Sequence, residues 1–491
     1  MLLKRILPLS FLFALIFSCE RDNQFPVDVQ ANDFVWKGLN AYYLYQDQVD
    51  DLSDRRFSND PQLLEYLQTF ETPEDIFNSL VIGTDTRSLL RTDYNQVGVP
   101  TEERSGFITG LEFAVIRDPG RLDSVLVYVL DVLPMSNASN QIVSRGDFFY
   151  AVVDDNNDTI RLAEDNYKDL LINYTQDTLK LLKTDFDGVD ISITDEQVDL
   201  VKENYIHEPI HFRKTFNFGP SRIAYLMYHN DFSRNYIDDI NNEMFNFRAQ
   251  GVNELILDLR YNIGAGSLAS TVAELASMIT SQFPNGVLMK ETWNSKAQPW
   301  FEINQPDSLL IRFPANLKEG QNINSLDLTD IYIILNGNGF RGSSTIELLI
   351  NSLAPYVNVH IIGNTTLGDN LGSINLYDSP DYDPFQINPN HTYGLEPVVL
   401  TFSNSNDETY NSGISPNLTL CPIEDPLNLG ELGETTDPIL NQVLNYILTG
   451  FPGTSPVCNP LDLEILYHSI NEQILIDSGI FIERDLPNLG R

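Results

Sequence analysis

Basic residues are scarce in this chain of 491 residues, which has 30 lysines and arginines against 69 aspartates and glutamates and a formal net charge of −39. Nucleic-acid phosphates and anionic membrane surfaces would repel such a protein, so the composition argues against both as partners. The acidic residues are spread along the sequence rather than gathered in a tail. The charge therefore favours a solvated surface without locating a site.

Cysteine and histidine are also scarce, with three and six residues. They leave little material for a zinc site, and we predict neither a metal nor a cofactor. Beyond Cys19 in the N-terminal segment, the chain contains only Cys421 and Cys458. In an oxidising compartment these two either form a disulfide with each other or remain two buried thiols.

Two stretches match parts of known metal-binding sequence patterns. "HEPIH" at residues 207–211 matches the pattern in which two histidines one helical turn apart bind zinc. Pro209 would break the helix that this geometry needs, so we predict an extended segment instead. The stretch from Asp154 offers alternating oxygens like a calcium loop, but Thr159 stands where that loop needs glycine, and a polar hairpin turn is favoured.

Long hydrophobic runs are absent except at the N-terminus. Lys4 and Arg5 precede an apolar run over residues 6–17, which is too short to span a bilayer and is typical of a secretory signal. "IFSC" at residues 16–19 resembles the lipobox of bacterial lipoproteins, whose cysteine becomes the lipidated first residue. We therefore predict an exported lipoprotein of the cell envelope, held to the membrane only by lipid on Cys19. The alternative is a plain signal peptide with an incidental cysteine.

The rest of the sequence predicts a multidomain α+β protein. Helical spacing in "NDFVWKGLNAYYLY" and a Thr cap followed by Pro in "TPEDIFNSL" indicate an N-terminal helical domain. Short strands such as "SVLVYVLDVL" follow, and strands then alternate with helices as in a parallel α/β core. The predicted divisions are a signal peptide at 1–19, a tether at 20–32, a helical domain at 33–97, a β-rich domain at 101–195, an α/β core at 196–450 and a C-terminal extension at 451–491, where "LDLEILYHSINEQIL" is expected to be helical.

Two stretches of the core carry the candidate chemistry. In "LILDLRYNIGAG" (255–266) a buried strand runs into Gly264 and Gly266, whose amides can face a ligand as in an oxyanion hole; turning glycines are the alternative. In "FRGSSTIELLIN" (340–351) Ser344 stands where a strand gives way to a helix. A hydroxyl there lies at the positive end of the helix dipole, which suits a nucleophile, but serine is also a common helix cap.

Together these stretches resemble the C-terminal processing (tail-specific) serine peptidases, which use a Ser–Lys dyad, and the likeness covers nearly the whole mature chain. "ELILDLRYNIGAGS" is similar to the family's Asp-Leu-Arg-x-Asn-x-Gly-Gly strand and loop, with Ala265 in place of the second glycine. "GSSTIELLINSLAPY" is similar to the family's Ser-Ala-Ser-Ala-Ser-Glu helix start, which places the nucleophile at Ser344, three residues before Glu347. The resemblance implies a crotonase/ClpP-like core and an oxyanion hole formed by the amides of Gly264 and Thr345.

The β-rich domain resembles a PDZ domain. "TGLEF" (109–113) is similar to the loop that holds a peptide carboxylate, "LPMSNAS" to the Pro-x-Ser-x-Ala segment and "RGDFFYAVVD" to the Gly-Asp strand. The resemblance implies a peptide or protein ligand captured by its C-terminus. The binding loop would then consist of Gly110, Leu111, Glu112 and Phe113.

The chain departs from the family at the general base. The family's lysine follows the nucleophile by 25 positions, and Asp369 stands there in this chain, with Asn364 in place of an acidic residue. A buried lysine accepts the serine proton as a neutral amine. An aspartate is shorter and its charge opposes the forming oxyanion, although a well-placed carboxylate can act as a base. His229, at the end of a predicted strand, is the one nearby candidate for a substitute base, whereas Lys290, Lys296 and Lys318 lie elsewhere in the core and none is near in sequence.

Three functions are consistent with this sequence. The first is a lipid-anchored serine-type endopeptidase in which Ser344 attacks a peptide and another base replaces the lysine. The second is an inactive homologue that acts as a peptide-binding scaffold in the cell envelope. The third is a structural lipoprotein whose acidic face serves an envelope assembly. Ser344 and Gly264 favour the first, whereas Asp369 and Ala265 favour the second.

Overall fold

The computed structural model describes residues 25–487 and 489, with gaps at 98–104, 230–231, 233, 263–266, 336–342, 422–423, 453–462, 471–478 and 488. The predicted signal peptide and lipidated Cys19, the oxyanion residue Gly264, and Cys458 therefore lie outside the described residues. Cys421 is disulfide-bonded, and its pairing with Cys458 stays a prediction. Among the helices that are described, none combines the length and the apolar character that crossing a membrane requires.

The N-terminal region is helical, as predicted. Its helices and short 3₁₀ turns are η1 (Val27–Val29), α1 (Gln30–Tyr42), η2 (Gln46–Gln48), η3 (Asp50–Leu52), α2 (Asp60–Leu67), α3 (Pro73–Leu80) and η4 (Tyr94–Gln96). The expected cap of α3 is present as a capping box, in which the Thr72 hydroxyl accepts from the amide of Asp75 and the Asp75 carboxylate accepts from the amide of Thr72.

The tether predicted at 20–32 is too long. Residues 27–32 already form η1 and the start of α1, because Phe25 and Val29 are buried and anchor this segment to the core. Helix α1 also packs closely on the core. A Cβ on Gly38 would lie 2.7 Å from the side chain of Leu395 and 3.2 Å from that of Leu376.

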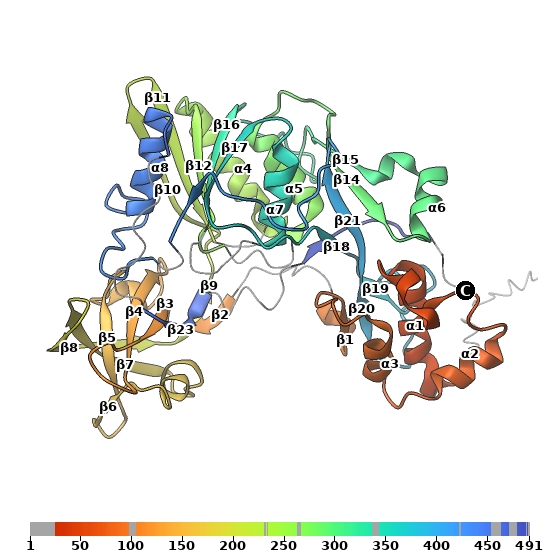
Figure 1. The fold of residues 1–491 in the computed structure, drawn as a ribbon, viewed down its shortest axis with the longest axis horizontal. Helices are drawn as coiled ribbons and strands as arrows, with labels where there is room; N and C mark the ends of the chain where they lie inside the picture. Colours follow the sequence, from red (N-terminus) through yellow and green to blue (C-terminus); the bar gives the residue numbers. More distant parts are fainter. Residues whose placement is uncertain are drawn as a thin grey trace, which may run out of the picture.

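Residues 105–206 form a β-rich module with a seven-stranded antiparallel sheet in the order β23-β3-β4-β5-β7-β8 plus β6 (Figure 1). Its elements are β2 (Ser105–Ile108), β3 (Leu111–Arg117), β4 (Val125–Val132), η5 (Ala138–Asn140), β5 (Phe148–Val153), β6 (Thr159–Arg161), the π-turn helix η6 (Lys168–Ile172), β7 (Thr178–Phe186), β8 (Ile191–Val201) and β9 (Glu203–Ile206). Residue 195, where the sequence placed the end of this domain, falls inside β8. No glycine or proline interrupts residues 191–208, so the strand continues.

The core contains a six-stranded sheet in the order β10-β11-β12-β16-β17-β22. Pairing is antiparallel between β10 and β11 and parallel from β11 onward, which agrees with the predicted alternation of strands and helices. Its strands are β10 (Ile210–Phe218), β11 (Ser221–Tyr228), β12 (Glu254–Asp258), β16 (Asp330–Ile334), β17 (Asn358–Gly363) and β22 (Leu418–Thr419).

Alternate side chains of this sheet enter different hydrophobic clusters. Along β11, Leu226 packs with helices α4, α5 and α7, whereas Tyr225 and Met227 pack with α8 on the opposite face. Figure 1 shows α8 apart from the group of α4, α5 and α7. The helices of the core are α4 (Arg234–Ala249), α5 (Ala269–Ile279), α6 (Ala297–Asn304), α7 (Ser344–Leu353) and α8 (Pro438–Thr449).

Two further sheets, one of six strands and one of three, complete the core. One has the order β13-β24-β18-β21-β14-β15, and the other joins the N-terminal region to the core in the order β1-β20-β19. Their elements are β1 (Leu89–Arg91), β13 (Ser267–Leu268), β14 (Val287–Trp293), η7 (Pro306–Leu309), β15 (Leu310–Arg312), β18 (Leu371–Ser373), β19 (Leu376–Tyr377), β20 (Gly394–Glu396), β21 (Val398–Asn404) and β24 (Ile480–Phe481).

The C-terminal extension is integrated into both parts of the protein. Strand β24 pairs with β13 and β18 of the core, and β23 (Ile465–His468) pairs with β3 of the β-rich module. The helix predicted over this stretch is therefore wrong at residues 465–468. Pairing with an open sheet edge has overridden the helical pattern of the isolated sequence.

A buried cluster of charges joins the β-rich module to the core. Arg145 of the module lies 2.9 Å from Glu424, and Glu424 lies 3.2 Å from Arg260 of the core. Arg260 also pairs at 2.7 Å with both Asp258 and Asp437. The two arginines and three carboxylates each expose 8% or less of their side chains, so each charge depends on the others for solvation.

Glu424 should control the acid stability of this junction. Burial raises its pKa, but Arg145 and Arg260 outweigh that effect and lower it from 4.5 to about 2. A lowered folded-state pKa stabilises the protein above pH 4.5, and this contribution is lost as the pH falls from 4.5 towards 2. The shift corresponds to roughly 3 kcal/mol.

We expect Glu424→Gln to lower the free energy of unfolding by about 3–5 kcal/mol at neutral pH, because two buried arginines lose a counter-ion. Urea unfolding should show the difference from the wild type shrinking as the pH falls below 4.5. Glu431→Gln, on an exposed residue of the same segment, is the control and should change little. Equal, pH-independent losses in both variants would contradict this account of the junction.

Candidate active site

Ser344 is the first residue of helix α7 and is fully buried. The preceding Ser343 caps the helix, because its hydroxyl accepts from the amide of Ile346 at 3.4 Å. The capping role that the sequence left open for Ser344 is therefore filled by its neighbour. The Ser344 hydroxyl is available for another contact.

That contact is with Asp369. The Ser344 hydroxyl donates to Oδ2 of Asp369 at 2.9 Å, so the structure brings together the two residues that the sequence placed at the nucleophile and base positions. The aspartate is short, but the loop after β17 carries its carboxylate to the serine. The shorter side chain of aspartate, compared with lysine, therefore does not prevent contact with the serine.

Glu347 holds this loop in place. Its carboxylate accepts from the amides of Gly368 at 2.6 Å and Asp369 at 2.8 Å, one helical turn after Ser344. Gly368 has a φ of +89°, and a Cβ there would lie 2.7 Å from the carbonyl oxygen of Asn411. Burial, assisted by the charge of Asp369, raises the pKa of Glu347, although its hydrogen bonds oppose the shift.

Arg87 supplies the positive charge at this site. It comes from the loop between α3 and β1 and forms a short ion pair with Oδ2 of Asp369, the oxygen that accepts from Ser344. The loop is fixed by Asp85, whose carboxylate accepts from the amides of Arg87 and Ser88 at 2.8 and 3.0 Å. Sequence analysis missed Arg87, because "GTDTRSLL" carries no motif and the contact joins residues far apart in the chain.

A guanidinium cannot take the place of the family's lysine as a base. Arginine stays protonated under all ordinary conditions, so Arg87 can neutralise Asp369 but cannot accept a proton from Ser344. The carboxylate is a much weaker base than a neutral amine. Among the contacts described for Ser344 and Asp369, the site therefore has a cation near the nucleophile position, and the acceptor of the serine hydroxyl is a carboxylate.

The candidate base His229 and the three lysines of the core have partners of their own. Lys290 pairs with Asp407 at 2.6 Å, Lys296 with Asp54 at 2.7 Å and Lys318 with Glu483 at 2.9 Å. His229 stacks on the ring of His211 with 4.1 Å between centroids. The contacts described for these four residues do not include Ser344.

One half of the predicted oxyanion hole can be placed. Thr345 is the second residue of α7, where backbone amides lack a partner within the helix. Its side-chain hydroxyl is buried without a hydrogen-bond partner among the described residues. The position suits a donor to an oxyanion, and the second predicted donor, Gly264, lies outside the described residues.

The predicted peptide-binding loop lies at the start of β3 and contacts the chain's own β23. Gly110 turns the chain with a φ of +83°, and a Cβ there would collide with Ser136 at 2.1 Å. The amide of Phe113 donates to the Ser469 hydroxyl at 3.0 Å, and that hydroxyl donates to Glu112 in a short hydrogen bond.

Strand β23 thus covers the edge of β3. It runs antiparallel with Ile465 opposite Ile116 and His468 opposite Ala114. Figure 1 shows it beside β3 and β4. Along this edge, a ligand that added itself as a further strand would have to take the place of β23.

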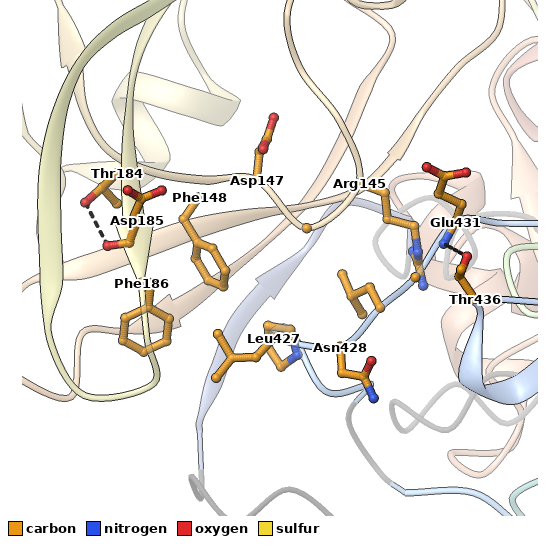
Figure 2. Close-up of a pocket in the computed structure, with 14 residues that line it drawn as sticks. Arg145, Asp147, Phe148, Thr184, Asp185, Phe186, Leu427, Asn428, Glu431 and Thr436 are labelled. Atoms are coloured by element: carbon orange, nitrogen blue, oxygen red, sulfur yellow. Dashed lines mark hydrogen bonds between the residues drawn. The ribbon is translucent and has the colours of Figure 1, made fainter.

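A cleft of roughly 570 Å³ opens between the β-rich module and the segment 426–436. Figure 2 shows Phe148 and Phe186 of the module facing Leu427 across it. Arg145 lines the inner end, so the cleft is the outer side of the charged junction. Ser344 and Asp369 are not among its lining residues.

Comparison with known proteins gives two findings. Residues 30–94 match the family model described as the peptidase S41 N-terminal domain. A solved structure described as an S41 protease, from Bacteroides fragilis, superposes with a TM-score of 0.62 at 20% identity, over 85% of this chain and 97% of that chain. The photosystem II D1 C-terminal processing protease superposes with a TM-score of 0.41 at 15% identity, over 82% of this chain and 96% of that chain.

No curated protein matches the chain in sequence. The N-terminal domain match and the fold shared with the Bacteroides fragilis protein nevertheless agree with the motifs of the core. They confirm the resemblance to the S41 family of C-terminal processing peptidases.

The Arg87–Asp369 ion pair should stabilise the fold, since the two side chains expose only 23% and 10% of their surface. We expect Arg87→Met to lower the free energy of unfolding by about 2–3 kcal/mol. In a double-mutant cycle with Asp369→Asn, measured by urea unfolding, the coupling should be about 1–3 kcal/mol.

The matched control is the Lys290–Asp407 pair, whose side chains are 29% and 75% exposed. Its coupling should stay below about 1 kcal/mol. Additive effects of Arg87→Met and Asp369→Asn would mean that the pair does not hold the loop to the N-terminal region.

Proposed function

We propose that this protein is an exported, lipid-anchored homologue of the C-terminal processing peptidases that binds peptides without hydrolysing them. The observation that carries the proposal is the hydrogen bond from Ser344 to Asp369, whose accepting oxygen is also paired with Arg87. A serine becomes a nucleophile when a base removes its proton as it attacks. Among the contacts described for Ser344, the group in that position is a carboxylate paired with an arginine.

Losing the base from such a dyad removes most of the rate. The oxyanion hole and substrate binding alone leave about 10³-fold acceleration over water. A site of this kind can still hold an extended peptide near Thr345 and the start of α7. Peptide binding is therefore the activity that this geometry supports best.

The second candidate is a working peptidase in which Asp369 itself is the base. The 2.9 Å hydrogen bond from Ser344 favours it, because a general base must lie within hydrogen-bonding reach. Against it, the alkoxide and oxyanion would form beside a negative side chain. Arg87 offsets that charge through its ion pair with Asp369, but a guanidinium cannot itself accept the proton.

Fluorophosphonate labelling separates the two candidates. We expect no covalent adduct on the purified exported chain by intact-mass spectrometry, because the reagent needs an activated serine. Ser344→Ala is the background control. An adduct on the wild type that is absent from Ser344→Ala would overturn the proposal in favour of a working peptidase.

Restoring the lysine tests whether the cleft is otherwise complete. We expect Asp369→Lys to become labelled at Ser344, since the cation of Arg87 would favour the neutral amine of the new lysine. The double variant Asp369→Lys with Arg87→Gln leaves more space for the new amine, and it is tested beside the single variant. Failure of both variants to react, while remaining folded, would show that more than the base has been lost.

We also propose that residues 105–206 form a PDZ-like module whose peptide site is occupied by β23. The support is the pairing of β23 with β3 and the contact of Ser469 with Glu112 and Phe113, residues of the predicted binding loop. Peptides that bind by strand addition use main-chain hydrogen bonds to such an edge. They would therefore compete with β23.

Weakening β23 should expose this edge. Tyr467→Pro removes a backbone donor and fixes φ in the middle of the strand, so we expect binding of extended peptides to tighten by at least about 10-fold. Fluorescence anisotropy with peptide pools bearing free or amidated C-termini measures the change and any preference for a carboxylate. Tyr467→Phe keeps the strand and is the matched control.

Equal affinities for the wild type, Tyr467→Pro and Tyr467→Phe would contradict a covered peptide site on β3. No binding by any of them, together with no labelling of Ser344, would favour a purely structural lipoprotein.

A further inference from the structure

A cluster of three potential metal ligands lies outside the candidate active site. Asp131, His211 and His229 each offer one ligand atom, and these atoms all lie within 4.8 Å of one another. Asp131 and His211 are buried, with 5% and 2% of their side chains exposed, and His229 is nearly so. His211 and His229 lie at the open end of the hairpin formed by β10 and β11, whereas Asp131 comes from the β-rich module, 80 residues before His211.

Local irregularities of the strands aim these side chains at one point. Asp131 is the penultimate residue of β4, and His229 directly follows β11. The pairing of β10 with β11 shifts register between Ile210 and Phe212, which leaves His211 in a β-bulge. Bulges re-aim a side chain out of the regular alternation and are frequent beside functional sites.

The spacing of two ligands already approaches that of a metal site. Nε2 of His211 lies 3.0 Å from Oδ2 of Asp131. Two ligands bound to tetrahedral zinc at about 2.0–2.2 Å are roughly 3.3 Å apart, so a small outward shift would admit the ion. The rings of His211 and His229 stack at an interplanar angle of 17°, and rotation of His229 would bring its nitrogen to the same ion.

The charges around the cluster also allow a cation. Arg145 is the nearby cation that acts on Asp131, but its guanidinium pairs with Glu424 at 2.9 Å and donates to the hydroxyl of Tyr261 at 2.6 Å. Its charge is therefore compensated within the buried junction. Asp131 remains as the carboxylate that would balance part of the charge of an ion.

We propose that Asp131, His211 and His229 form a binding site for one divalent transition-metal ion of the zinc type. Two imidazoles and one carboxylate are a donor set that zinc accepts, with water as a fourth ligand. Asp131 belongs to the seven-stranded sheet, His211 lies in β10 and His229 directly follows β11, so the ion would connect the β-rich module to the core. The three ligands do not include Ser344, and Asp131 lies opposite Glu112 of the predicted peptide-binding loop in the pairing of β3 with β4.

The proposal revises the role of both histidines. The sequence offered His211 as a partner of His207 and rejected that pair, correctly, because the segment is extended rather than helical. The ring of His207 instead packs edge-on against Tyr205 at 5.0 Å. His229, considered as a substitute base, faces His211 in the cluster.

Metal binding to the untagged, chelator-treated exported chain tests the site. We expect one Zn²⁺ per chain by isothermal titration calorimetry and elemental analysis. Co²⁺ in its place should give the visible absorption of a four-coordinate site. His211→Gln and His229→Gln should each weaken Zn²⁺ affinity at least about 100-fold. Mutation of residues that only hydrogen-bond to metal ligands typically weakens affinity 10–100-fold.

His207→Gln is the matched control, since it removes a neighbouring imidazole outside the cluster, and it should bind as the wild type does. Asp131→Asn keeps the size of the side chain and should also weaken Zn²⁺ binding. It serves as the test variant if either histidine variant misfolds. Absence of stoichiometric Zn²⁺ binding by the wild type would overturn the proposal. Equal loss of affinity in His207→Gln and His229→Gln would overturn it as well.

Discussion

The ion pair between Arg87 and Asp369 is the contact on which the candidate active site depends. It joins the loop that follows β17 to the N-terminal helical region, and the same carboxylate oxygen holds the hydroxyl of Ser344. Glu347 fixes the backbone of that loop from the helix that begins at Ser344. The serine, its acceptor and the arginine are thus held by three parts of the chain at once.

This arrangement explains how a carboxylate can lie beside the nucleophile position in a closed site. The charge of Asp369 faces the positive end of α7, and its other oxygen accepts from the amide of Leu371 at 3.3 Å. Arg87 compensates the same charge through the ion pair. Under the proposed function, the loop can therefore stay closed over Ser344 with an aspartate where the resembled family has its lysine.

The β-rich module is tied to the core by contacts of another kind. Arg145, Glu424 and Arg260 form a buried chain of charges, and β23 crosses from the C-terminal extension to the edge of β3. Both connections join the module to distant segments of the chain, and β23 occupies the edge of β3. A ligand at β3 would have to compete with the chain itself.

Much of the fold follows from local sequence, whereas the decisive contacts do not. The Thr72 capping box, the strands of the core and the start of a helix at residues 343–344 are encoded by neighbouring residues, and the motifs around Ser344 lead to Asp369 by spacing alone. Arg87 and the cluster of Asp131, His211 and His229 depend on residues brought together from different elements, and no local pattern marks them. The helix expected at residues 465–468 failed for the same reason, because the open edge of β3 decides the conformation.

The most direct test of the account is a comparison of peptide products. The wild-type chain without its predicted signal segment and the matching Ser344→Ala variant would be incubated with the same pool of extended peptides, and the new peptide ends would be identified by mass spectrometry. The account predicts that the two profiles are indistinguishable while both proteins retain the same bound peptides. Cleavage products that depend on Ser344 would contradict it.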